Sequence, residues 1–114
     1  MGDCPFCKIV SGDVPATIVR NGARTLAFRD INPQAPTHVL VIPKVHHPTV
    51  AAMASAEPEL TAELLLEAAA VAADEGIADS GYRVVFNTGA AAGQSVFHVH
   101  AHVLGGRRMA WPPG

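Results

Sequence analysis

Three histidines at alternate positions mark the segment of this sequence with the greatest chemical potential. His98, His100 and His102 lie within residues 94–104, and apolar residues fill every position between them. Because side chains alternate between the two faces of a strand, the three imidazoles should share one face. The outer two would then lie roughly 13 Å apart, at a rise of about 3.3 Å per residue. The opposite face should be buried, since it is apolar throughout: Phe97, Val99, Ala101 and Val103.

A row of imidazoles indicates either metal binding or catalysis at phosphorus. Histidines are common zinc ligands, although the outermost pair is too widely spaced for one ion unless the strand bends. Alternatively, a neutral imidazole can attack a phosphoryl group, while its neighbours fix its tautomer and stabilise the developing oxyanion. Backbone N–H groups of residues 93–95 could bind phosphate oxygens, and Ser95 could donate to a leaving group. A purely structural cluster is the third interpretation, but histidine is a poor core filler.

Two cysteines near the N-terminus, Cys4 and Cys7, form a C-x-x-C motif. A redox role would need a following βαβ pattern, which the sequence does not show. A zinc site would need two further ligands, for which His46 or His47 and the histidine row are candidates. The pair could also anchor the N-terminal arm as two small apolar side chains. Spacing alone leaves these alternatives open.

Composition limits the classes of protein to which the chain can belong. Its 114 residues are enough for one domain with one core. The net charge is −2 and no basic run occurs, which argues against a nucleic-acid-binding protein. No apolar stretch is long enough to span a bilayer, and the first residues lack the apolar segment of a signal peptide. We therefore expect no membrane association and a cytoplasmic location, where cysteines remain thiols or bind metal.

The elements that must position these residues form an α+β pattern around an antiparallel sheet. Asn21-Gly22 predicts a hairpin turn, and residues 37–43 are apolar on both faces, as in a central strand. Asp30 either caps a turn or reaches a ligand. His38 opens the central strand and gains interest only if it lies beside the other histidines. Five strands are expected, at residues 16–20, 25–30, 37–43, 82–87 and 94–104.

One long helix and a short N-terminal helix complete the expected fold. The short helix should end at Gly12, and the long one should run from an N-cap at Ser55 to about residue 75. Gly76 would end it. The long helix should bury one apolar stripe that consists of Leu60, Leu64, Ala68 and Val71. Its opposite face should be solvated, since it carries the carboxylates of Glu59, Glu63 and Glu67.

Residues 94–102 resemble the signature of the histidine triad (HIT) superfamily, in which apolar residues separate three histidines. Other stretches resemble its Hint branch, namely residues 4–8, 26–31, 35–38, 41–44 and 104–114. The resemblance therefore covers essentially the whole chain. It implies a single HIT domain over residues 1–114, a HIT-like α+β fold and a homodimer.

The resemblance implies a purine nucleoside 5′-phosphoramidate hydrolase, which releases a nucleoside monophosphate and an amine through a nucleotidyl-histidine intermediate. His100 would be the nucleophile, and His102 would contact the α-phosphate oxygens. His38 would hydrogen-bond His100 and orient it, and Ser95 would assist the departing amine. Further residues would bind the nucleotide: Asp30 at the ribose hydroxyls, Ile31 against the base, and Asn87, Gly93 and Gln94 at phosphate and ribose.

The resemblance also implies a closed structural zinc site built from Cys4, Cys7, His46 and His98. This divides the triad, because His98 would serve the metal while the other two histidines serve phosphate. His47 follows His46 where relatives commonly have an apolar residue, so it is a second candidate ligand. Alanines occupy residues 90–92 and 110, where relatives often have polar side chains, so the leaving-group preference should differ.

The expected partners are a purine nucleotide substrate, such as a phosphoramidate of AMP, and a second copy of the chain. Neither nucleic acid nor membrane is expected. Two other functions compete with the hydrolase. One is an AMP-binding, zinc-stabilised dimer that acts mainly as a binding or regulatory module. The other is hydrolysis of dinucleoside polyphosphates, against which the Hint-like ending at residues 104–114 argues.

Overall fold

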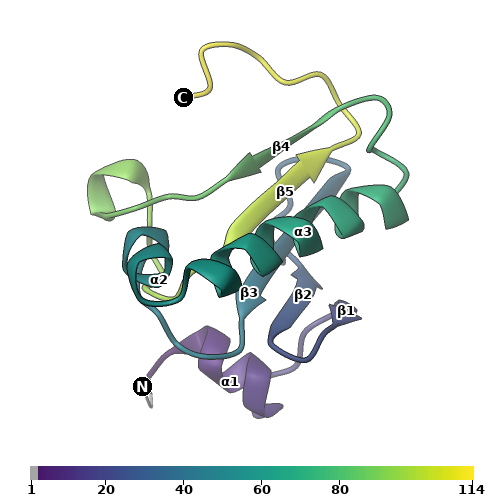
Figure 1. Cartoon of the computed structure of the whole chain (residues 1–114). Helices are drawn as coiled ribbons and strands as arrows, with labels where there is room; N and C mark the ends of the chain where they lie inside the picture. The colour runs from purple at the N-terminus through teal and green to yellow at the C-terminus, as the bar shows by residue number, and fades with distance from the viewer. Residues whose placement is uncertain (1–2) are drawn as a thin grey trace.

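A computed structural model describes residues 3–114, which form an antiparallel sheet with helices against both of its faces (Figure 1). The strand order is β1-β2-β3-β5-β4. The α+β prediction is thereby confirmed. Along the chain the elements are α1 (Pro5–Ser11), β1 (Ile18–Asn21), β2 (Thr25–Arg29), β3 (Thr37–Pro43), α2 (Val50–Ala56), α3 (Pro58–Asp74), β4 (Tyr82–Val85), the 3₁₀ turn η1 (Ala90–Ala92) and β5 (Ala101–Gly105).

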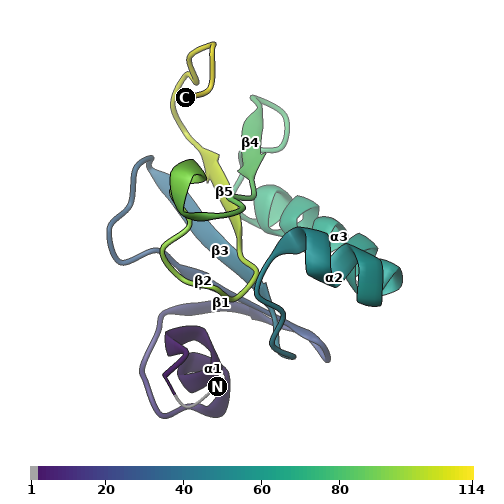
Figure 2. The same cartoon turned by 90° about the vertical axis from the view of Figure 1, so that its left-hand side faces the viewer.

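The central strand β3 is buried along its whole length, as its apolar faces predict. Its alternate side chains enter two separate cores. Val39 and Val41 pack into the core beneath α3, whereas Leu40 and Ile42 pack into a second core with α1. Figure 2 shows α2 and α3 together on one side of the sheet and α1 apart from them. The sheet therefore has one face covered by the long helix and another that faces α1.

The expected long helix is divided in two at Pro58, and the prediction of an N-cap at Ser55 is wrong. Thr49 caps α2 instead, because its side chain accepts a hydrogen bond from the backbone N–H of Ala52 at 3.1 Å. Proline disfavours a helical conformation in the residue before it, and Glu57 has an extended φ of −140°. The helical path therefore breaks at Glu57 and restarts as α3.

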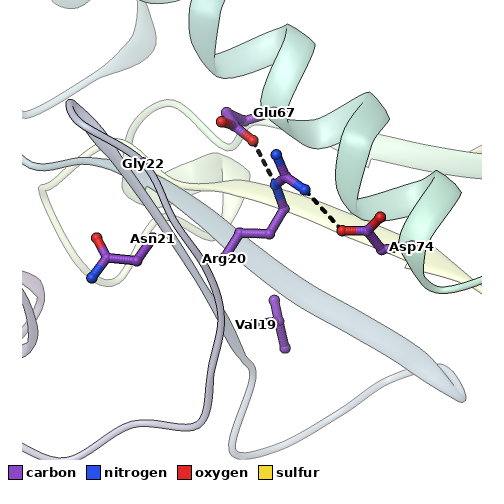
Figure 3. A pocket seen from close by; sticks show the side chains of 6 residues that line it. All are labelled: Val19, Arg20, Asn21, Gly22, Glu67 and Asp74. Atoms are coloured by element: carbon purple, nitrogen blue, oxygen red, sulfur yellow. Dashed lines mark hydrogen bonds and ion pairs between the residues drawn. The ribbon is translucent and has the colours of Figure 1, made fainter.

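Helix α3 buries the predicted stripe and ends at Asp74, and Gly76 beyond its C-cap Glu75 takes a left-handed φ of 75°. Its carboxylate face is less solvated than expected, because two arginines of the β1–β2 hairpin pair with it. Arg20 lies between Glu67 and Asp74, at 2.7 and 2.8 Å (Figure 3). Arg24 pairs with Glu63 at 2.6 Å. These exposed pairs contribute modestly to stability, and they hold the hairpin against the helix.

The histidine segment is less regular than the expected strand over residues 94–104. Only residues 101–105 pair as β5, so His98 and His100 precede the strand and His102 lies within it. Val99, Ala101 and Val103 are buried as predicted, but Phe97 is 48% exposed. The prediction for Phe97 is therefore wrong, because this part of the chain joins the sheet only at Ala101, four residues later. Strand β4 also ends earlier than expected, at Val85.

Within residues 3–114, every helix falls short of the length and apolar character that crossing a bilayer requires.

The capping geometry predicts different effects for two hydroxyl residues of the same helix. Thr49→Ala should lower the free energy of unfolding by about 1 kcal/mol, because the backbone N–H of Ala52 loses its acceptor. Ser55→Ala should change it by less than about 0.5 kcal/mol, since Ser55 is exposed inside α2. Urea denaturation of both variants measures the difference. A larger loss for Ser55→Ala would contradict the observed cap.

Candidate functional site

Three histidines meet where β3 and β5 lie side by side. His38 opens β3, and its Nε2 lies 2.9 Å from Nδ1 of His102 on β5. The ladder pairs His38 with Leu104, which makes His102 its diagonal neighbour on the same face. The rings of His100 and His102 are 4.9 Å apart between centroids. His38 therefore lies beside the other histidines, as a functional role for it would require.

A chain of hydrogen bonds fixes the proton positions on His38 and His102. The backbone N–H of Gln34 donates to Nδ1 of His38 at 3.0 Å, so the proton of the neutral ring must be on Nε2. That Nε2–H donates to Nδ1 of His102, which leaves the His102 proton on its own Nε2. The buried Nε2 of His102 has no hydrogen-bond partner among the described residues. This N–H is therefore available to donate a hydrogen bond to a ligand.

Both rings in this chain are neutral near pH 7. Burial lowers the pKa of His38, and the nearby Asp30 carboxylate only partly opposes the effect. Burial also lowers the pKa of His102 to about 4, with smaller contributions from the charges of His100 and His38. Neutral rings are required for the donor–acceptor order of the chain, because a protonated imidazole has no acceptor nitrogen.

His100 takes its orientation from the backbone and not from another imidazole. Its Nδ1 lies 2.8 Å from the carbonyl oxygen of His98, to which it must donate. Its Nε2 therefore carries the free lone pair, as a nucleophile needs. The expectation that His38 hydrogen-bonds and orients His100 is wrong. His100 precedes the paired part of β5, whereas His102 is the residue that the ladder brings to His38.

A cavity of about 450 Å³ opens beside these histidines. Its polar lining includes His100, His102, Asp30 and Ser95. Most of the remaining lining is apolar, and it comes from α1, β2, β3 and neighbouring loops: Pro5, Phe6, Ile9, Val14, Pro15, Ala16, Phe28, Ile31, Leu40 and Val96. An apolar cavity with a few convergent polar groups is typical of a small-molecule site.

The predicted nucleotide-binding residues divide into two groups. Asp30, Ile31 and Ser95 line the cavity, together with His100 and His102. The other predicted contacts do not line it, namely Asn87, Gly93 and Gln94.

Gln94 is committed to the loop in which it lies. Its Oε1 accepts from the backbone N–H of Gly89 at 2.8 Å. Its Nε2 donates to the carbonyl oxygens of Pro48 and Val96, at 2.7 and 3.1 Å. The side chain is buried, and the backbone N–H of Gln94 donates to the carbonyl oxygen of Gly89 at 3.1 Å. Its amide therefore shapes the turn that precedes the histidines.

Asp30 serves as a turn cap, which was one of its two predicted roles. Its Oδ1 accepts from the backbone N–H of Asn32 at 2.8 Å. Its Oδ2 lies 3.4 Å from Nε2 of His38 and is part of the cavity wall. The cap leaves one carboxylate oxygen facing the site, so the second role is compatible with the first.

Sequence reasoning missed the contribution of α1 to this cavity. Phe6 and Ile9 are part of its wall, and Phe6 is 8% exposed. No local sequence signal identifies this contribution, because it depends on how α1 docks against the sheet.

A second cluster brings together Cys4, Cys7, His46 and His98, with one ligand atom from each within 4.8 Å of all the others. The Nδ1 atoms of His46 and His98 are 3.2 Å apart. The sulfur–nitrogen contacts measure 3.3 Å for Cys4 with His98 and 3.5 Å for Cys7 with either histidine. The four residues come from α1, the loop after β3 and the segment before β5.

These distances match the edges of a tetrahedral zinc site. With Zn–S near about 2.3 Å and Zn–N near about 2.05 Å, two nitrogens lie about 3.3 Å apart, and sulfur and nitrogen about 3.6 Å. The Nε2–H of the buried His98 donates to the carbonyl oxygen of Pro43 at 2.8 Å, which leaves Nδ1 free for a metal. Two thiolates and two imidazoles form a closed set that could hold a structural zinc ion.

His47 is outside this cluster, although it follows His46 directly. Its Nε2 pairs with Oε2 of Glu57, at the start of α3. The alternative that His47 binds the metal is therefore not supported by the side-chain positions.

Asp30, His38 and His102 also lie close enough to share an ion. The hydrogen bonds argue against that use. A metal on Nε2 of His38 would force the ring proton onto Nδ1, where the backbone N–H of Gln34 already donates. The hydrogen bonds of this group instead determine which ring nitrogens of His38 and His102 carry protons.

Comparison with known proteins places the chain among HIT proteins. A family model described as the HIT domain matches residues 11–109. A 14 kDa zinc-binding protein of Zea mays is 52% identical over 112 residues, which cover 96% of this chain and 86% of that protein. The adenylylsulfatase HINT1 of Arabidopsis thaliana is 46% identical over 112 residues, covering 96% and 75%.

A solved structure resembles the fold closely. The crystal structure of a HIT family hydrolase from Legionella pneumophila superposes with a TM-score of 0.94 at 51% identity. The match covers 98% of this chain and 100% of that one. The arrangement of strands and helices is therefore that of a HIT hydrolase.

The cluster geometry predicts that metal binding requires Cys4 but not His47. Cys4→Ala should reduce bound zinc to well below one equivalent, because it removes one of four ligands. His47→Ala should keep one equivalent, since His47 pairs with Glu57. Elemental analysis of both purified variants gives the ratios. Full zinc in Cys4→Ala, or its loss in His47→Ala, would contradict the assignment.

The low pKa of His102 predicts how stability depends on pH. The ring should protonate near pH 4 in the folded protein and near 6.5 when unfolded, so the unfolded chain binds more protons between these values. The free energy of unfolding should therefore fall as pH drops from about 6.5 to about 4. NMR titration of the His102 ring measures the folded pKa. In His102→Gln this part of the pH dependence should disappear, and an unchanged slope would contradict the prediction.

Proposed function

The chain belongs to the HIT domain family, and on that premise we propose that it hydrolyses purine nucleoside 5′-phosphoramidates. One observation carries the proposal. His100 presents a free Nε2 to the cavity, and His102 presents an Nε2–H without a partner among the described residues. A nucleophile beside a fixed donor is the arrangement that substitution at phosphorus needs.

In the proposed first step, Nε2 of His100 attacks the α-phosphorus and forms a phosphorus–nitrogen bond to the imidazole. The bond from phosphorus to the leaving nitrogen breaks, and the amine departs with its electron pair and a proton. Ser95 lines the cavity, and we assign to it the donation of a proton to that amine. The carbonyl of His98 holds Nδ1–H of His100 and stabilises the positive charge that develops on the ring.

In the second step, water attacks phosphorus and gives one proton back to Ser95, while the bond to His100 breaks and its electron pair returns to the imidazole. The nucleoside monophosphate leaves and the imidazole regains its neutral form. Throughout both steps Nε2–H of His102 donates to a non-bridging phosphate oxygen, whose negative charge grows in each transition state. His38 acts indirectly, because its hydrogen bond to Nδ1 of His102 keeps the His102 proton on Nε2.

The rest of the nucleotide fits the two kinds of lining in the cavity. We assign the base to the apolar wall, with Ile31 against it, and the ribose hydroxyls to the Asp30 carboxylate. Asn87, Gly93 and Gln94 would contact phosphate or ribose from the adjoining loop. These three residues lie outside the cavity lining, so they would need the ligand to extend beyond it.

The proposal includes zinc in the Cys4, Cys7, His46 and His98 centre, where it would be structural. It also includes a single HIT domain over residues 1–114 and a homodimer. Strand β4 supports the dimer, because it is an edge strand that pairs only with β5 within residues 3–114. The exposed Leu66 on α3, at 71%, adds apolar surface to the molecule.

The name of one relative supports a second candidate substrate with a different leaving group. The Arabidopsis relative is named as an adenylylsulfatase, and the same attack by His100 would release sulfate from adenylyl sulfate. Rates on adenosine 5′-phosphoramidate, adenylyl sulfate and a dinucleoside polyphosphate would rank the three leaving groups. Tight AMP binding with negligible turnover of all three would favour a binding or regulatory module.

His100→Ala should lower kcat on adenosine 5′-phosphoramidate by about 10³-fold or more, because no other described side chain replaces its Nε2. AMP affinity should change much less, since His102 and the apolar wall remain. Steady-state kinetics and calorimetry measure the two effects, with circular dichroism as the control for folding. Undiminished turnover by a folded variant would remove His100 from the mechanism.

A further inference from the structure

Helix α1 belongs to both sites of the molecule. Cys4 is its N-cap residue and Cys7 lies in its first turn, and both are members of the metal cluster. Phe6 and Ile9 of the same helix form part of the cavity wall. In Figure 2, α1 stands apart from the pair of helices that covers the other face of the sheet. A seven-residue helix therefore connects the proposed zinc centre to the proposed nucleotide site.

Phe6 is the residue through which the two sites touch. Its ring meets that of His100 edge to face, with centroids 5.0 Å apart and planes at 82°. It meets the ring of His98 in the same way at 5.9 Å, and Phe28 at 5.5 Å. One side chain thus contacts a metal ligand, the proposed nucleophile and the opposite wall of the cavity.

Two kinds of contact hold α1 in place, apolar packing and the cysteines of the metal cluster. Helices of this length are unstable alone in water, so α1 depends on its tertiary contacts. Phe6 is its one buried residue, and Ile9 and Val10 are half-buried against the same core. The sulfur of Cys4 also accepts the backbone N–H of Cys7 at 3.3 Å, so the cap of the helix is itself a cluster ligand. Docking of α1 therefore rests on Phe6 and on the cysteines.

The cluster also reaches His100 along the backbone. His98 supplies Nδ1 to the cluster, while its carbonyl accepts Nδ1–H of His100 at 2.8 Å. A change in the position of His98 would therefore move the acceptor that sets the His100 tautomer. The ring contact and the backbone contact act on the same imidazole.

We propose that metal in the Cys4, Cys7, His46 and His98 centre controls nucleotide affinity at the cavity, with Phe6 as the positioning residue. The inference rests on the proposed function, since it concerns the same nucleotide. With metal bound, α1 holds Phe6 against His100 and closes the apolar wall. Without metal, the wall formed by α1 is no longer fixed. Nucleotide binding must then order this wall, and the lost conformational entropy weakens the affinity.

The test measures AMP binding by calorimetry on zinc-loaded and chelator-treated protein. In the wild type, metal removal should weaken AMP binding at least tenfold. In Phe6→Ala, AMP binding should be weaker from the start and should change less than twofold on metal removal, because the coupling residue is absent. Phe6→Leu retains apolar bulk and should recover most of the metal dependence. Circular dichroism confirms that the sheet persists in each sample.

A reciprocal measurement uses the zinc-loaded protein alone and does not require a folded metal-free form. Because coupling between two sites is mutual, AMP should slow zinc transfer to a chromophoric chelator in the wild type but not in Phe6→Ala. Direct chelation of zinc by AMP would accelerate the transfer, so the sign separates the two effects. This readout does not depend on turnover.

Two results would overturn the inference. One is AMP affinity that stays within twofold after metal removal, in protein that remains folded, together with zinc transfer that AMP does not slow. The other is a Phe6→Ala variant as sensitive to metal as the wild type. Failure of zinc-loaded wild type to bind AMP at all would contradict the proposed function, and the inference with it.

Discussion

His98 is the residue on which the arrangement of both sites depends. Its ring is fully buried, and each of its polar groups has a different partner. Nε2–H donates to the carbonyl of Pro43, Nδ1 faces the cysteines, and the carbonyl oxygen accepts from His100. A buried polar residue must satisfy all of these groups, so its position allows little freedom. The start of the histidine segment is thereby fixed before β5 begins.

The histidines divide their roles according to what their other nitrogen contacts. Imidazole has one donor and one acceptor when neutral, so a single hydrogen bond decides the chemistry of the opposite nitrogen. A carbonyl partner on Nδ1 leaves the Nε2 lone pair of His100 free, and an imidazole partner leaves His102 with a free Nε2–H. A carbonyl partner on Nε2 leaves Nδ1 of His98 free for a metal. Burial keeps His38 and His102 neutral, so their part of this order persists at pH 7. Three residues with the same side chain are thus suited to the three different roles proposed for them.

The sequence predicted the features that local patterns control. The β3 boundaries were correct because residues 37–43 are apolar on both faces, and the zinc ligands are clustered as the resemblance implied. The partner of His38 was wrong because it depends on the register between β3 and β5, which is a long-range property. Ser55 was a plausible cap, but Thr49 starts the helix six residues earlier and Pro58 divides it. Phe6 was missed because its role appears only when α1 docks.

The alternation of β3 explains how a small domain can carry so many polar groups beside its sheet. Val39 and Val41 enter the apolar core beneath α3. Their neighbours Leu40 and Ile42 point to the other face, on which His38 and His102 also lie. Hydrophobic burial under α3 therefore does not depend on the histidines or on α1. The face toward α1 is then free to hold a cavity, neutral imidazoles and a metal cluster, whose rearrangement would leave the principal core intact.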